Sequence, residues 1–171
     1  MKILLKTLMK TLALSGVLLA SAASSAAVMV NFVKPENYPD MPFSPVDRDA
    51  TLKDIADYFT RLGANLPEGT DLHIDVLDLD LAGHLQPSRR GDRDIRIMRG
   101  GADWPRMTLH FSVESGGKVI NSGDAQLQDM DYQFRANRLT DSDPLRYEKG
   151  MIDDWFYKTI APRKKGSGRN G

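Results

Sequence analysis

One stretch of the chain, DLHIDVLDLDLA from Asp71 to Ala82, decides the fold. Its apolar side chains occupy even positions up to Val76 and odd positions from Leu77 onward. Successive side chains of a strand point to opposite faces, so a strand with this change keeps one buried face only by inserting an extra residue. The stretch therefore predicts a long strand with a bulge or sharp bend at Val76-Leu77, closed by Gly83.

Further strands are predicted on either side of this one. Their apolar and polar residues alternate at a period of two, which is typical of half-buried strands. Gly116-Gly117 predicts a tight hairpin turn between the last two strands. Val119, Ala125 and Leu127 are expected on one face of the returning strand. The predicted strands span Val28–Val33, Asp94–Met98, Met107–Val113 and Lys118–Leu127.

Two amphipathic segments predict helices. Thr51 can cap the first helix, which is expected to end at Gly63 because the residue after a helix often needs a left-handed backbone. Asp143 can cap the second, with Pro144 at the first helical position and Pro162 at the end. The apolar faces comprise Leu52, Ile55, Ala56, Phe59 and Leu62 in the first helix and Leu145, Met151, Ile152, Trp155, Phe156 and Ile160 in the second.

The order of these elements predicts an α+β fold. We expect a two-layer sandwich in which two helices cover one face of a mostly antiparallel sheet of about four to five strands. A chain of this size can bury enough surface to fold without a metal ion or a disulfide. It contains no cysteine, which excludes a thiolate metal site and a cysteine nucleophile.

The start of the chain resembles a secretory signal. Residues 1–27 combine three lysines, a short apolar run from Thr11 to Ala20 and small residues that permit cleavage near Ala27. The apolar run is too short for a membrane span, which needs about 20 residues. We therefore expect a periplasmic or secreted protein with a Sec-type signal peptide and no membrane span after the signal is removed.

The charge balance changes once the two ends are set aside. The 171 residues hold 23 Lys and Arg against 23 Asp and Glu. Residues 163–171 carry four basic side chains and no acid, and their composition predicts a disordered basic tail. The intervening segment, Val28 to Pro162, is the predicted single domain, with a net charge of minus seven. An acidic domain is not typical of a nucleic-acid-binding protein, which usually has a basic surplus.

None of the familiar catalytic motifs is supported by its sequence context. The three histidines lack the spacing of a zinc-binding helix, and no cysteine can complete a zinc site. Ser115 and Lys118 match the letters of a serine–lysine site, but Gly116 and Gly117 replace the helical turn that such a site requires. The sequence therefore favours a protein without catalytic residues, cofactor or metal ligands.

Five Asp-x-Asp pairs could contribute to a cation site, because hard cations prefer several carboxylate oxygens. Asp78 and Asp80, on one predicted strand, point to the same face and could form a shallow cation or partner site. None of the pairs extends into a calcium-binding loop, and solvated or capping aspartates are the simpler interpretation. The pairs are Asp47/Asp49, Asp78/Asp80, Asp92/Asp94, Asp129/Asp131 and Asp141/Asp143.

Six arginines lie within 18 residues of the acidic domain: Arg89, Arg90, Arg93, Arg96, Arg99 and Arg106. Arginine binds phosphate or carboxylate through paired hydrogen bonds, so the cluster could bind an anion or an acidic partner. The alternative is a loop and an edge strand with surface ion pairs, each of which contributes little stability. If a site exists, Arg96, Arg99 and Arg106 are expected to face the anion.

Six segments are spread in order along nearly the whole predicted domain: VNFVKPENYPD (Val30–Asp40), DVLDLDLAG (Asp75–Gly83), DIRIMR (Asp94–Arg99), WPRMTLHFSV (Trp104–Val113), GGKVINSGDAQLQD (Gly116–Asp129) and DPLRYEKGMIDDWF (Asp143–Phe156). Together they resemble a family of exported bacterial proteins known as domain of unknown function 3016. The resemblance implies a secreted or periplasmic protein of Gram-negative type. It supplies no activity, cofactor or catalytic residue.

Three functional hypotheses follow. The first is a non-catalytic envelope protein that binds a partner protein or an anionic ligand in the periplasm. The second is a metal-assisted hydrolase that uses Asp78, Asp80 and a histidine such as His73, which predicts stabilisation by divalent cations. The third is a small structural or chaperone-like module, which an exposed apolar groove between helix and sheet would favour.

Overall fold

The computed structural model describes residues 26–87, 94–134 and 142–162. Residues 1–25 of the predicted signal, Arg89, Arg90 and Arg93, and the predicted basic tail lie outside the described residues. The elements follow in the order β1 (Val28–Phe32), the 3-10 turn η1 (Pro35–Asn37), α1 (Pro45–Gly63), β2 (Thr70–Asp80), β3 (His84–Gln86), β4 (Ile95–Ile97), β5 (Arg106–Ser115), β6 (Lys118–Gln128), α2 (Arg146–Trp155) and the π-helical turn η2 (Phe156–Ile160).

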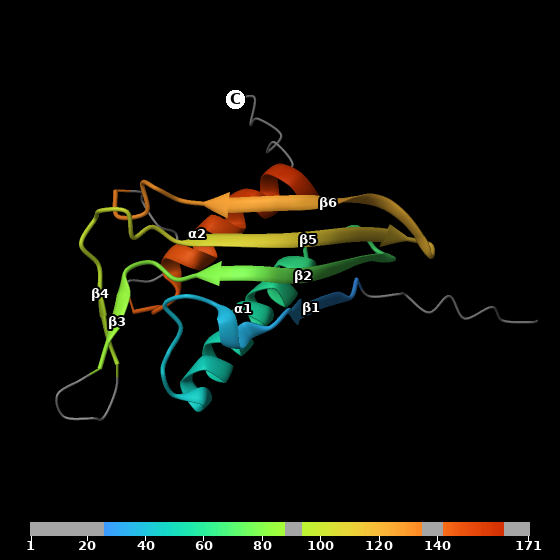
Figure 1. The fold of residues 1–171 in the computed structure, drawn as a ribbon. Coiled ribbons are helices and arrows are strands. Elements are labelled where there is room, and N and C mark those ends of the chain that lie inside the picture. The colour runs from blue at the N-terminus through green and yellow to red at the C-terminus, as the bar shows by residue number, and fades with distance from the viewer. Residues whose placement is uncertain (1–25, 88–93, 135–141, 163–171) are drawn as a thin grey trace, which may run out of the picture.

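Four strands form the main sheet in the order β1-β2-β5-β6 (Figure 1). The β2–β5 and β5–β6 pairs are antiparallel, whereas β1 runs parallel to β2, to which α1 connects it. β3 and β4 pair with each other in a separate two-stranded sheet, here named the end hairpin, which lies beyond one end of the main sheet. The prediction of a mostly antiparallel sheet is confirmed, while β3 falls in a segment that had no predicted strand.

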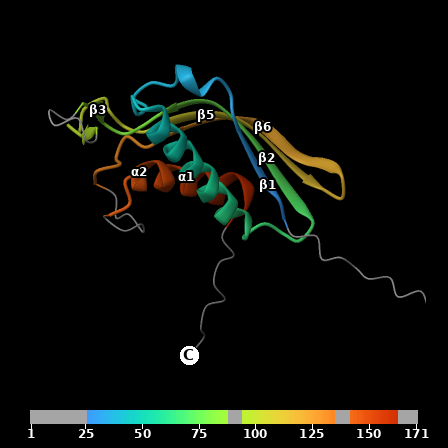
Figure 2. The ribbon, with the colours of Figure 1, turned by 90° about the horizontal axis from the view of Figure 1, so that it is seen from below.

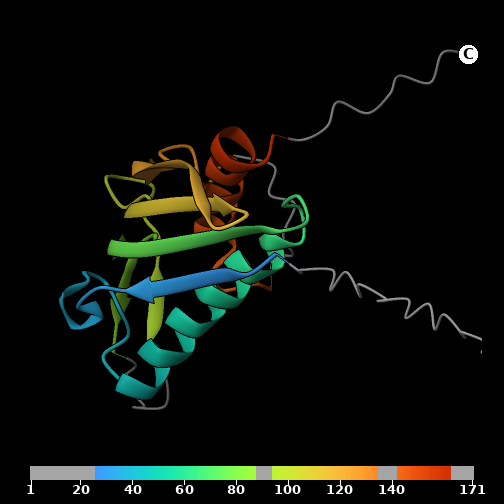
Figure 3. The same cartoon turned by 90° about the vertical axis from the view of Figure 1, so that its right-hand side faces the viewer.

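Both helices pack against the same face of the main sheet (Figures 2 and 3), which confirms the predicted two-layer α+β arrangement. Apolar side chains from both layers meet there to form the core. The other face of the sheet, here named the open face, carries mostly polar residues. Fully buried core residues include Ile55, Phe59, Leu72, Val76, Leu79, Leu109, Ile152 and Phe156.

The predicted bulge in β2 is confirmed. The pairing of β2 with β5 shifts between Val76 and Asp78, so Leu77 is the inserted residue. Leu77 is 45% exposed, whereas Val76 and Leu79 are fully buried. One inserted residue thus returns the later leucines to the core side.

The start of α1 differs from the prediction. Thr51 is not its cap, because the helix begins about two turns earlier with Ser44 as the N-cap, whose Oγ accepts a hydrogen bond from the Asp47 amide at 3.4 Å. Pro45 suggests a break in the sequence, yet proline is favoured in the first helical turn, where its missing N–H is not needed.

Gly63 ends α1, as predicted, but for a different reason. Its backbone is not left-handed; instead, a Cβ atom at this position would lie 2.3 Å from Val28 Cγ2. The helix end therefore needs glycine because it packs closely against β1.

The start of α2 also differs from the prediction. The helix begins at Arg146, after Pro144. Asp143 caps the preceding turn instead, where its Oδ1 accepts a hydrogen bond from the Leu145 amide at 2.8 Å. Helical structure ends at Ile160, two residues before Pro162.

The β5–β6 hairpin confirms one prediction and corrects another. Gly116 and Gly117 have φ values of 57° and 73°, as a tight hairpin turn requires. A register shift after the turn pairs Val119 with Glu114. Val119 is therefore 58% exposed and does not share the buried face of Leu127.

Candidate binding groove

Arg96 belongs to a buried ionic framework rather than to an exposed cluster. Its guanidinium donates hydrogen bonds to the carbonyl oxygens of Ala82 and Pro144 and forms an ion pair with Glu148. Glu148 is fully buried, and its Oε1 also accepts a hydrogen bond from the Ala82 amide at 2.8 Å. This pair fastens α2 to the end of β2 and to β4. Sequence patterns do not reveal Glu148, because an isolated glutamate in a helix normally faces solvent.

Lys149 is a second buried ion in the same framework. Its Nζ lies 2.7 Å from Asp54 Oδ2 in α1 and 2.8 Å from Asp143 Oδ2. It also lies 5.8 Å from the ring centre of Tyr58. Burial alone would raise the pKa of Asp143, but the hydrogen bonds from Lys149 and the Leu145 amide and the charge of Lys149 outweigh it and hold that pKa below its usual value. Lys149 therefore joins the two helices through charge as well as packing.

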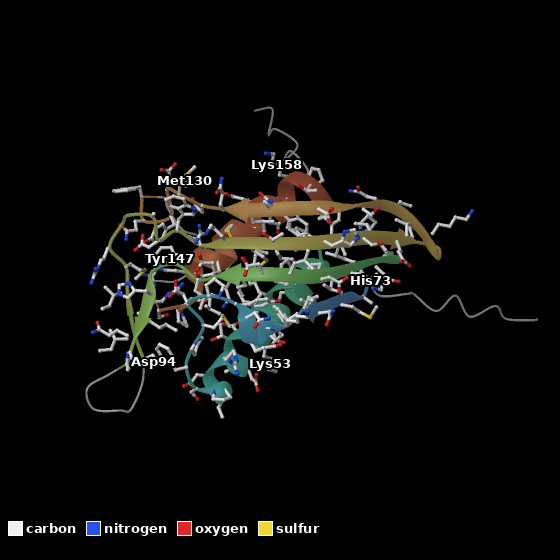
Figure 4. All side chains as sticks on the ribbon, viewed as in Figure 1. Lys53, His73, Asp94, Met130, Tyr147 and Lys158 are labelled. Atoms are coloured by element: carbon white, nitrogen blue, oxygen red, sulfur yellow. The ribbon has the colours of Figure 1, made fainter. Side chains whose placement is uncertain are left out.

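A groove of about 480 Å³, here named the end groove, opens beside this framework. It lies between the N-terminal half of α1, the end hairpin and the turn before α2. Figure 4 shows Asp94, one of its lining residues, beside the end hairpin, and His73 toward the opposite end of the sheet. Its apolar lining is formed by Pro42, Ala50, Leu81, Leu85, Pro144 and Leu145, and its polar lining by Asp47, Thr51, Asp54, Asp94 and Arg96.

Apolar side chains continue from the groove onto the surface. A second cavity of about 300 Å³ shares Pro42 and Leu85 with the end groove and is also lined by Phe43. Phe43 is 65% exposed, and its amide donates a hydrogen bond to Asp94 Oδ2 at 3.3 Å. Val46, one helical turn before Ala50, is 76% exposed. Apolar groups gathered at a cavity mouth are typical of interaction sites.

The groove and the ions that support it carry a net charge of minus three. Five carboxylates face two cations, and each cation is already engaged by a carboxylate of the framework. The carboxylates are Asp47, Asp54, Asp94, Asp143 and Glu148, and the cations are Arg96 and Lys149.

The other two arginines expected to face an anion lie in different surroundings from Arg96. Arg106 Nε donates a hydrogen bond to Asp80 Oδ2 at 3.0 Å, and this hydrogen bond, with the charge of Asp80, raises the pKa of Arg106. Arg99 is exposed, and its backbone amide donates a hydrogen bond to Asp103 at 2.7 Å. Anion binding by Arg96, Arg99 and Arg106 stays a prediction.

The residues of the metal-hydrolase hypothesis are spread along β2. Asp78 and Asp80 pair with Thr108 and Arg106, two positions apart on β5, so they share the open face. His73 is seven residues from Asp80, about 23 Å of extended strand. Within the described ranges, no group of three or more His, Asp or Glu side chains could hold a metal ion.

The open face also carries a histidine–aspartate pair. His110 Nδ1 lies 2.7 Å from Asp124 Oδ1, an arrangement that can orient a histidine as a base. The two side chains are 48% and 82% exposed. The end groove, its smaller neighbour and a cavity of about 510 Å³ between β6 and α2 are lined by other residues. The pair therefore lacks the enclosed surroundings that a substrate site usually has.

These features define an α+β domain with an acidic, apolar-lined groove at one end. In the part of the chain that the structure describes, no helix is long and apolar enough to cross a membrane. The chain belongs to the family described as "Protein of unknown function (DUF3016)", whose profile matches residues 26–158, so the resemblance noted in the sequence is confirmed. No curated protein and no solved structure is significantly similar to the chain.

Proposed function

We propose that the protein is an exported, non-catalytic module that binds an envelope protein through the end groove. The observation that carries this proposal is a groove of about 480 Å³ whose lining combines apolar side chains with a few charged ones. Sites of about 300–1,000 Å³ with mainly apolar linings and a few convergent polar groups are typical of binding sites.

The ionic framework supports this function because it holds the groove walls in place before binding. Arg96 and Glu148 join the end hairpin to α2, and Lys149 joins α2 to α1. The three walls come from these same elements. A site that is already ordered loses less conformational entropy when a partner binds, so more of the interaction energy contributes to affinity.

Export rests on the signal pattern of residues 1–27 and is consistent with the position of β1. β1 begins at Val28, and the Ala27 amide nitrogen lies 3.0 Å from Asp71 Oδ1. Cleavage after Ala26 would leave a charged amino group beside that carboxylate. We expect the intact mass of the protein from a periplasmic extract to correspond to a chain that begins at Ala27 or Val28. A full-length mass confined to the cytoplasmic fraction would contradict export.

Binding through the groove can be tested by photo-crosslinking in living cells. A photoreactive amino acid at Ala50, an exposed residue of the groove lining, is expected to capture a discrete partner. The matched control places the same amino acid at Thr60, which is exposed on the same helix but outside the groove. Equal adducts at both positions, or none at Ala50 in a correctly exported protein, would refute the proposal.

A further inference from the structure

We infer that the end groove receives a segment of a partner protein in which an apolar side chain is flanked by lysine or arginine. This inference rests on the proposed function, since it names the chemistry of the partner that the groove binds.

The positive charge expected of the partner segment follows from the carboxylates of the groove. Asp54 forms an ion pair with Lys149, whose Nζ lies 2.7 Å away and is shared with Asp143. Within residues 26–87, 94–134 and 142–162, no ion pair engages Asp47 or Asp94, and both line the groove. Two carboxylates of the groove lining thus lack a cation from the described part of the domain, and a basic partner would supply one.

Arg96 does not reverse this preference. Its Nε donates to Ala82, one terminal nitrogen to Pro144 and the other to Glu148, and its side chain is only 16% exposed. An anion entering the groove would have to compete with the buried Glu148 for this guanidinium while lying among the carboxylates that line the groove. The structure therefore favours a cationic partner over the anionic one suggested by the arginine cluster.

The apolar part of the site indicates a polypeptide rather than a small cation. Leu81, Leu85 and Leu145 line the groove. Phe43 lines the adjoining cavity, Val46 lies one helical turn before Ala50, and the two side chains are 65% and 76% exposed. A small amine inside the groove would leave these two side chains in water. A peptide segment covers both the groove and its rim, as in other modes of recognition in which apolar anchors fill pockets and charges set specificity.

The inference can be tested with three fluorescent peptides and the full-length protein. The first peptide places leucines between lysines, the second replaces each lysine by glutamate, and the third replaces each leucine by serine. We expect fluorescence anisotropy to detect binding of the first peptide only, with an affinity that falls as salt is added. Backbone amide NMR shifts are expected at Ala50, Thr51 and Leu85.

Paired variants separate the groove from general electrostatic attraction. Asp47→Asn combined with Asp94→Asn is expected to weaken binding of the lysine–leucine peptide about 3- to 10-fold, whereas Asp49→Asn, on the same helix outside the groove, leaves it unchanged. Phe43→Ser is expected to weaken binding, and Phe134→Ser, which alters another exposed phenylalanine outside the groove, is its control. The phenylalanine pair keeps the test valid if the double aspartate variant does not fold.

Several results would overturn the inference. Preferential binding of the glutamate peptide would indicate an anionic partner, and equal binding of the serine peptide would indicate charge attraction without an apolar anchor. Shifts confined to Asp75 and Asp124 would place the peptide on the open face. If Ala50 crosslinks to a partner through an acidic segment, the proposed function survives and this inference fails. If Ala50 captures nothing, the proposed function itself fails.

Discussion

Replacing Arg96 by methionine tests whether the buried ionic framework holds the end of the molecule together. Methionine retains an apolar stem but removes the charge and the hydrogen bonds that the guanidinium donates. The variant leaves Glu148, whose side chain is 0% exposed, without its cation. It also removes the donors to the carbonyl oxygens of Ala82 and Pro144.

The size of the effect follows from the burial of the carboxylate that is left behind. Removing one partner of a buried ion pair costs about 3–5 kcal/mol, because the other charge stays buried. Arg106→Met leaves Asp80, whose side chain is 7% exposed, but Arg106 itself is 52% exposed, so water can replace it. We expect Arg106→Met to lower the free energy of unfolding by about 1–3 kcal/mol. Arg99 is exposed, so Arg99→Met is expected to lower it by less than about 0.5 kcal/mol.

Urea unfolding measures how much stability each of the three arginine variants loses. Fluorescence of Trp155, which is 8% exposed and packs against Phe59 and Phe111, can report loss of the core. We expect Arg96→Met to lower the unfolding midpoint most, Arg106→Met less and Arg99→Met least, at similar slopes. In thermal melts the Arg96→Met loss corresponds to a Tm lower by about 10 °C or more.

A second substitution tests whether the unpaired charge of Glu148 causes the loss of stability in Arg96→Met. Changing Glu148 to methionine in the Arg96→Met background removes the stranded charge, so the double variant is expected to be more stable than Arg96→Met alone. If the stabilities of Arg96→Met and Arg99→Met differ by less than about 0.5 kcal/mol, the Arg96–Glu148 ion pair does not stabilise the fold.

Three further predictions concern the framework, the helix end and the bulge. The pKa of Asp143 lies below its usual value of 3.8, so the ionised carboxylate stabilises the fold above pH 3.8, and this contribution is lost as the pH falls through the lowered pKa. We therefore expect the decrease in Tm caused by Lys149→Met to be largest at neutral pH and to shrink in acid. A decrease that does not depend on pH would contradict the role of the Lys149 charge. Gly63→Ala is expected to lower the free energy of unfolding in urea by about 1–3 kcal/mol, because the added Cβ would lie 2.3 Å from Val28 Cγ2 in β1. A variant as stable as the parent would show that this contact relaxes freely. Leu79→Ala is expected to lower the free energy of unfolding by about 2–5 kcal/mol, because Leu79 is fully buried. Leu77→Ala is expected to lower it by less than about 1 kcal/mol, because Leu77 is 45% exposed. Equal losses of stability in calorimetry would place the bulge elsewhere.

The strands of the main sheet were predictable because their signals are local, whereas β3 carries no such signal. The change of parity at Val76-Leu77 marks the bulge, and Gly116-Gly117 marks the hairpin, since each depends on the geometry of a few adjacent residues. Pro45 shows the limit of such signals, because the same residue blocks a helix interior and favours a helix start. Only the backbone that surrounds it decides between the two.

The sequence by itself determined the family, the α+β class and which faces of the strands and helices are apolar, because periodicity at 2 and 3.6 residues follows directly from backbone geometry. The tertiary structure decided which charged side chains are buried and which partners they have. Arg96 and Glu148 are 52 residues apart in the chain, and Lys149 and Asp54 are 95 apart. Such pairs leave no periodic trace, since an ion becomes buried only when distant elements pack around it and supply its partner. The groove that these pairs support exists for the same reason only in the folded domain.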